Sequence, residues 1–247
     1  MRRDRSSSRL RRLHLPALLR CTLVLWAISG AAGWAATFPA GSPRATLTQM
    51  VGFDEIEITY SRPRVRGRTI WGALVPYGEI WRTGANYPTK ITFPSEVQIE
   101  GRPLAEGSYA LYTIPGEGAW TIIFSRNTEL WGAFGYNLED DALRVSVEPR
   151  PAEHAESFTI EFADVTGHSA ILTLLWERLA VPIRIEVDTA ERVAGNIELV
   201  LQEEGEDTTW GFYWRAAQYL LEHDADLERA LDFIQRSLKM ERNWMNV

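Results

Sequence analysis

The sequence is poor in the residues that most reaction chemistries need. Its 247 residues include one cysteine and four histidines. The cysteine, Cys21, lies in an apolar N-terminal run, so export with removal of that run would leave no thiol and no disulfide. Such a chain excludes thiol chemistry and depends on its hydrophobic core for stability. His154, His168 and His223 are isolated in sequence, which argues against a zinc site.

The standard catalytic motifs are missing as well. There is no G-x-S-x-G, no H-E-x-x-H, no phosphate-binding G-x-x-x-x-G-K-[ST] and no G-x-G-x-x-G. The acidic pair Asp140-Asp141 is interpreted as a solvated turn. The sequence therefore predicts no metal and no cofactor, and it assigns no catalytic residue.

Basic residues are scarce outside the N-terminus. The net charge is −7, but residues 1–36 contribute seven arginines and one aspartate, so the rest carries 19 basic and 32 acidic residues. A protein that binds a polyanion normally shows the opposite sign. Nucleic acid is therefore not expected as a partner.

Residues 1–36 have the pattern of a secretory signal. Residues 2–20 are rich in arginine, and residues 21–36 are mostly apolar and end in small residues. This run is shorter than the roughly 20 residues that a membrane-spanning helix needs. Cleavage between Ala32 and Ala36 is therefore favoured over an uncleaved anchor, and an exported protein, periplasmic or extracellular, without a stable membrane span is expected.

Residues 42–187 alternate between short apolar runs and turn residues. Glu55–Tyr60 places a hydrophobic side chain at every second position, and no amphipathic helix interrupts the series. The pattern predicts a mainly β domain, an antiparallel β-sandwich or barrel of about eight strands. The expected strands are Ala45–Val51, Glu55–Tyr60, Ile91–Ile99, Ser108–Ile114, Ala119–Ser125, Leu143–Val147, Ser157–Phe162, Ser169–Trp176 and Pro182–Val187.

The pattern changes after residue 187. Residues 188–207 hold seven acidic residues and one basic residue, which predicts an acidic linker. Residues 208–243 have helical periodicity and predict an αα-hairpin that resembles one tetratricopeptide unit, with Trp214, Ala230 and Ile234 at motif positions. Since a solenoid needs about three repeats to bury its faces, the face with Leu227, Leu231 and Ile234 is expected to pack on the β domain or on a protein partner.

The stretch 60–92 is the best functional clue, because it carries a net charge of +5 within an acidic protein. Arginines suit carboxylate or phosphate recognition through their planar fork, and an aromatic residue beside an arginine allows stacking. The alternatives are a solvated loop with one or two ion pairs, and a structural role for Trp81 and Arg82. The candidate ligand-binding residues are Tyr60, Arg62, Arg66, Arg68, Trp81, Arg82 and Asn86.

The motifs of this stretch resemble the signature of the bacterial domain-of-unknown-function (DUF) family 2911. They are Tyr60-Ser61-Arg62-Pro63, Gly67-Arg68, Ile70-Trp71-Gly72, Leu74-Val75-Pro76-Tyr77-Gly78 and Trp81-Arg82-Thr83-Gly84-Ala85-Asn86. The similarity covers roughly residues 42–187. It implies an exported protein, in some members followed by a tetratricopeptide-like segment, but no activity. The residue after Gly-Ala-Asn is usually acidic in such sequences, whereas here it is Tyr87.

Three functional hypotheses follow. The first is an exported binding module whose arginine-rich loop and Trp81–Asn86 segment recognise an anionic or carbohydrate ligand. The second is an envelope hydrolase that uses Tyr60, Arg82 and Asn86 without a standard triad. The third is a scaffolding protein that binds a protein partner through the hairpin.

The signal pattern makes the first prediction. Protein purified from its own host should begin between residues 32 and 37, because the signal is removed on export. Intact-mass measurement and N-terminal sequencing check this. A mature chain that still begins at Met1 would support the membrane-anchor interpretation instead.

Overall fold

The computed structural model describes residues 39–205, 208–223 and 226–240. The predicted signal at 1–36 and the last residues of the 208–243 hairpin lie outside these ranges. The described residues from 41 onward are assigned to a single unit. Within the described part of this unit, ten strands are followed by three α-helices, and a short 3₁₀-helix, η1 (Leu138–Asp140), precedes β8.

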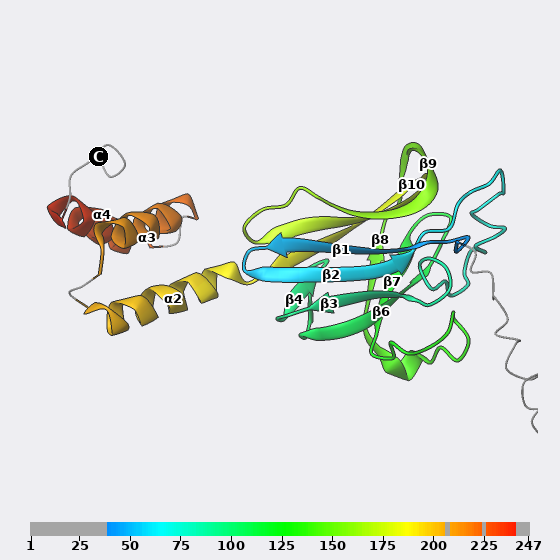
Figure 1. Ribbon diagram of the computed structural model, residues 1–247, viewed down its shortest axis with the longest axis horizontal. Coiled ribbons are helices and arrows are strands. Elements are labelled where there is room, and N and C mark those ends of the chain that lie inside the picture. Colours follow the sequence, from blue (N-terminus) through cyan, green and yellow to red (C-terminus); the bar gives the residue numbers. More distant parts are fainter. Residues whose placement is uncertain (1–38, 206–207, 224–225, 241–247) are drawn as a thin grey trace, which may run out of the picture. The chain divides into compact units, whose positions relative to one another are not determined.

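The strands form two antiparallel sheets that enclose the main hydrophobic core (Figure 1). One sheet has the order β1-β2-β3-β6-β7-β8 and the other β5-β4-β10-β9. The predicted sandwich is therefore confirmed, and the sheets do not close into a barrel. The strands are β1 (Arg44–Val51), β2 (Asp54–Ser61), β3 (Thr89–Phe93), β4 (Val97–Ile99), β5 (Arg102–Leu104), β6 (Gly107–Ile114), β7 (Trp120–Ser125), β8 (Asp141–Val147), β9 (Arg150–Ala163) and β10 (Ser169–Val187).

Several strand boundaries differ from the sequence prediction, two of them for clear physical reasons. The expected strand Ile91–Ile99 divides around Pro94 into β3 and β4, which belong to different sheets, because proline cannot donate a ladder hydrogen bond. The expected strands 169–176 and 182–187 instead join as β10. An irregularity of register at Glu177, whose φ is +56°, interrupts the pairing with β9, and β10 continues to pair with β4 at 185–187.

The predicted acidic linker is instead largely helical. Helix α2 (Thr189–Glu203) begins after Asp188, whose side chain accepts a hydrogen bond from Glu191 N–H at 3.0 Å and caps the first turn. Val193, Ile197 and Leu201 recur every fourth residue and contribute to a second apolar core. The acidic composition hid this spacing, because the charged residues occupy the other faces of the helix.

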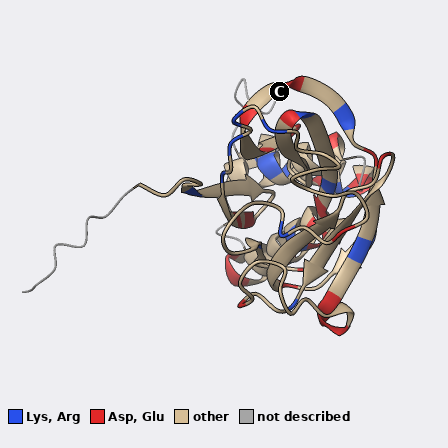
Figure 2. Ribbon diagram, turned by 90° about the vertical axis from the view of Figure 1, so that its right-hand side faces the viewer, with Lys and Arg blue, Asp and Glu red and all other residues tan. Residues whose placement is uncertain are grey.

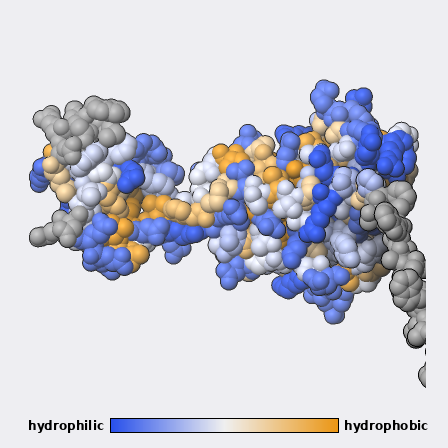
Figure 3. All heavy atoms as spheres, in the orientation of Figure 1, coloured by the Kyte–Doolittle hydropathy of each residue, from blue (hydrophilic) through white to orange (hydrophobic). Residues whose placement is uncertain are grey.

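The predicted αα-hairpin is present as α3 (Trp210–Glu222) and α4 (Leu227–Met240). Its packed face is centred on Tyr213, Leu220 and Phe233, together with α2. Leu227 and Leu231, expected to be packed, are exposed and line an apolar groove with Trp214, Leu221 and Ile234. Hydrophobic atoms are visible at the surface of the helical segment (Figure 3).

The long connection 62–88 between β2 and β3 is fixed by aromatic packing. Trp71 contacts Trp120 of β7 with ring centroids 5.0 Å apart and Trp176 of β10 at 5.8 Å, so one side chain touches both sheets. Trp81 stacks on Trp176 at 5.7 Å and meets Phe158 of β9 at 5.4 Å. Trp71 and Trp81 of the connection are therefore part of the core, whereas residues 66–69, 72–74 and 76–79 are exposed.

This cluster predicts a large stability effect. Trp176 is 2% exposed, so Trp176→Ala should lower the free energy of unfolding by about 3–5 kcal/mol. Trp131→Ala is the matched control, because that side chain is exposed and should cost little. Urea unfolding of both variants checks this, and equal losses would contradict it.

Candidate functional site

Two of the predicted ligand-binding arginines donate hydrogen bonds to backbone carbonyls. Arg62 Nε donates to Phe158 O at 3.0 Å, and its Nη2 donates to Thr159 Oγ1 at 2.7 Å. Arg68 Nε donates to Val65 O at 3.0 Å, and its Nη2 contacts Arg64 O. These side chains tie the connection to β9 and to itself. Their donors are already used in part by the fold.

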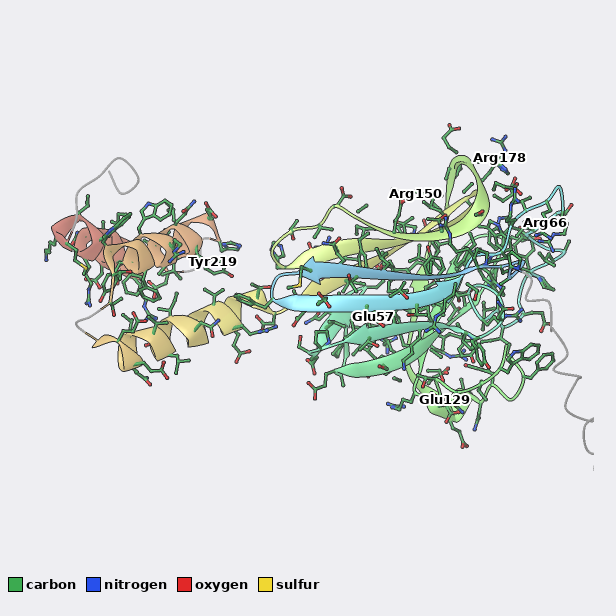
Figure 4. All side chains as sticks on the ribbon, viewed as in Figure 1. Glu57, Arg66, Glu129, Arg150, Arg178 and Tyr219 are labelled. Carbon is green, nitrogen blue, oxygen red and sulfur yellow. The ribbon has the colours of Figure 1, made fainter. Side chains whose placement is uncertain are left out.

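The other exposed arginines of the stretch surround Glu156. Arg64 Nε lies 3.5 Å from Glu156 Oε1, which also accepts the backbone N–H of Arg66 at 3.1 Å. Among the described residues, the Arg66 side chain donates a hydrogen bond only to Gly41 O, at 3.5 Å, and Figure 4 labels it at one end of the sandwich. Figure 2, which faces that end, shows basic and acidic segments interspersed. Strand β2 ends at Ser61, so Arg62, Arg64, Arg66 and Arg68 lie in the connection that follows it and not along one strand face.

Tyr60, Trp81 and Asn86 also have intramolecular partners. The Tyr60 hydroxyl accepts from Ile160 N–H at 3.1 Å, within the core. Trp81 Nε1 donates to Gly84 O at 3.2 Å. Asn86 Nδ2 donates to Ser61 Oγ at 3.3 Å and to Ser42 O at 3.4 Å.

Arg82 stands apart from these residues. Trp81 N–H donates to Thr113 O at 2.8 Å and Thr113 N–H donates to Trp81 O at 2.9 Å, so residue 81 pairs with β6. Since successive side chains of an extended segment point to opposite sides, Trp81 enters the core while Arg82 lies on the outer face of the six-stranded sheet. There it interacts with Tyr112.

The Arg82 guanidinium has no ion-pair partner among the described residues. Its Nε is buried and makes no hydrogen bond there, although the side chain as a whole is only half-buried. Burial lowers the pKa of Arg82, and Tyr112 opposes that shift. Arg82 is therefore a partly desolvated cation that forms no ion pair with a carboxylate of the described part of the chain.

The connection between β7 and β8, residues 126–140, covers the outer face of the sheet next to Arg82. Leu130, Ala133 and Tyr136 pack on a small apolar cluster that includes Tyr112. The Tyr112 hydroxyl donates to Gly132 O at 3.3 Å. Apolar contacts and a buried hydrogen bond therefore hold the connection against the outer face of the six-stranded sheet.

The acidic pair is not the solvated turn that the sequence suggested. The side chain of Asp141 is 7% exposed, and its Oδ2 accepts from Tyr136 Oη at 2.6 Å and from Arg144 Nε at 2.5 Å. Asn127 Nδ2 donates to Asp140 Oδ2 at 3.2 Å. The hydrogen bonds of both carboxylates therefore stabilise the two ends of the connection.

Two exposed aromatic side chains of this connection were not among the predicted site residues. Trp131 is 60% exposed and Phe134 is 74% exposed. They flank Gly132 within the sequence Trp-Gly-Ala-Phe-Gly-Tyr, residues 131–136. That density of aromatic residues and glycine is the sequence signal that could have identified them.

The fold and this arrangement define a β-sandwich protein with C-terminal helices and a half-buried arginine facing solvent. A family model described as "protein of unknown function (DUF2911)" matches residues 42–185, more than half of the chain, so the chain belongs to this family. The family resemblance of the sequence motifs is thereby confirmed. No curated protein and no solved structure matches the chain.

The described residues contain no group of three or more histidine, cysteine, aspartate or glutamate side chains arranged to hold a metal ion. Within the same part of the chain, no helix is long and apolar enough to cross a membrane.

The environment of Tyr112 predicts a pH effect. Burial and the neighbouring Tyr136 raise the pKa of Tyr112 to about 12, above the value of about 10 expected in an unfolded chain. The native state therefore holds this proton more tightly, and stability should fall as the pH rises from about 10 to about 12. Tyr112→Phe should make the fall in the free energy of unfolding shallower, and identical slopes in urea unfolding would refute this.

Proposed function

We propose that this is an exported protein of the bacterial envelope that binds an anionic or glycan-like ligand, with Arg82 as the anion contact. The observation that carries the proposal is the partly buried Arg82 guanidinium, which has neither an ion pair nor a hydrogen bond at Nε among the described residues. A partly desolvated cation without a partner costs free energy. A bound carboxylate or phosphate would offset that cost.

Arginine suits this role by its geometry. Its planar fork offers parallel donors that match the two oxygens of a carboxylate. The backbone that carries Arg82 is fixed by the hydrogen bonds between Trp81 and Thr113. The ligand would therefore bind a donor on a backbone whose position is already fixed, and little of the protein would need to be ordered on binding.

The other candidate residues fit the proposal less well. Arg62, Arg68 and Asn86 already donate to the protein's own oxygens. For the alternative of a hydrolase, Tyr60 and Arg82 would have to converge, but they lie on opposite faces of the six-stranded sheet. The alternative of a scaffolding protein is favoured by the apolar groove between α3 and α4, although the structure shows nothing that fills it.

The proposal predicts anion-dependent stabilisation of the full mature chain. A carboxylate or phosphate at 100 times its dissociation constant should stabilise the fold by about 2.7 kcal/mol, which raises the melting temperature by a few degrees. Arg82→Gln should abolish this shift, and Arg66→Ala, which removes an exposed arginine at one end of the sandwich, should preserve it. Thermal unfolding with acetate, phosphate, uronates and sulfated sugars at constant ionic strength measures both.

Two results would contradict the proposal. If every anion stabilises the wild type and Arg82→Gln equally, only general screening by salt is at work. If Arg82→Gln strongly destabilises the ligand-free protein, Arg82 has a structural role instead. The expected result without ligand is no loss of stability, because glutamine removes an unpaired charge.

A further inference from the structure

Gly132 lies next to both Arg82 and Phe134. Its φ is +71°, and a Cβ atom built at this position would lie 3.5 Å from Arg82 Nη1 and 3.4 Å from Phe134 Cδ2. The guanidinium and the aromatic ring are therefore close to each other, and glycine at this position avoids a side chain that would contact both. A ligand bound at the guanidinium is consequently near the exposed ring of Phe134.

Building on the proposed function, we propose that the ligand is an acidic sugar, a uronic acid residue, whose carboxylate binds Arg82 while its ring lies against Trp131 and Phe134. The proposal joins two observations, the unpaired cation and the exposed aromatic pair on the other side of Gly132.

The aromatic pair has the form of a binding surface. The ring planes of Trp131 and Phe134 are 6° from parallel, with centroids 6.1 Å apart. Leu130 and Ala133 of the connection pack on the apolar cluster that includes Tyr112, whereas Trp131 and Phe134 are exposed to solvent. Exposing apolar surface is unfavourable, and exposed apolar groups that lie together mark contact sites.

A sugar ring matches this surface chemically. The face of an aromatic ring is partially negative, so it attracts the polarised C–H groups that a sugar presents on the face of its ring. A uronic acid carries its carboxylate at the edge of that ring, so one residue can cover Phe134 and reach Arg82 across Gly132. A small anion such as phosphate reaches only the guanidinium.

The acidic residues of the connection 126–140 favour a ligand with a single carboxylate over a ligand with many negative charges. Glu129, Glu139 and Asp140 lie in this connection, and Figure 4 labels Glu129 on it, away from Arg66. These acids would repel a run of phosphates. A single carboxylate held at Arg82 avoids most of that repulsion.

The test measures binding of glucuronate and galacturonate to the full mature chain by calorimetry at constant ionic strength. Glucose and galactose are matched neutral rings, acetate is a carboxylate without a ring, and benzoate is a flat aromatic carboxylate. Trp131→Ala and Phe134→Ala should each weaken uronate binding about tenfold, and Arg82→Gln should weaken it further. Leu138→Ala, which removes another exposed apolar side chain of the same connection, should leave binding unchanged.

The results separate this inference from the proposed function. If acetate binds as well as the uronates and both aromatic variants bind like the wild type, Arg82 is an anion site but the acidic-sugar inference is wrong. Tighter binding of benzoate than of either uronate also overturns the inference. If no anion distinguishes the wild type from Arg82→Gln, the inference and the proposed function both fail.

Discussion

Aromatic packing between the two sheets is the interaction on which the rest of the structure depends. Trp71 and Trp81 each meet Trp120 of one sheet and Trp176 of the other. Phe158 packs on Trp81 and Trp176. Three of these indoles have a buried Nε1–H without an oxygen acceptor among the described residues. The contacts of Trp71 with Trp120 and Trp176 are edge-to-face, the geometry in which an N–H can face a neighbouring ring and recover part of that cost. The cluster thereby fixes the connection 62–88, and with it the position of residue 82.

The placement of Arg82 follows from this packing. Because Trp81 is drawn into the core and pairs with Thr113, the next side chain must emerge on the outer face of the sheet. The alternation of Trp81 and Arg82 could be recognised in the sequence, but the partner strand β6 and the covering connection 126–140 could not. Both depend on contacts between residues far apart in the chain.

The sequence predicted the sandwich well because its strands carry period-two patterns bounded by turn residues, as in Glu55–Tyr60. It failed where composition hid a pattern, since the acids of 188–207 concealed the apolar spacing of α2. The partners of Arg62 could not be predicted either, because Phe158 and Thr159 come close to it only in the folded chain.

In the proposed site, binding and stability are separated by a single residue step. Trp81 serves the core, whereas Arg82 is held by the same backbone with no ion-pair partner among the described residues. The connection beside it is fastened underneath by Tyr112 and by the Tyr136–Asp141–Arg144 contacts, so Trp131 and Phe134 are presented from a fixed base. In such a site, part of the cost of desolvating the arginine is already met in the free protein. Binding is favoured by this preorganisation, because fewer side chains and loops must be ordered when the ligand binds.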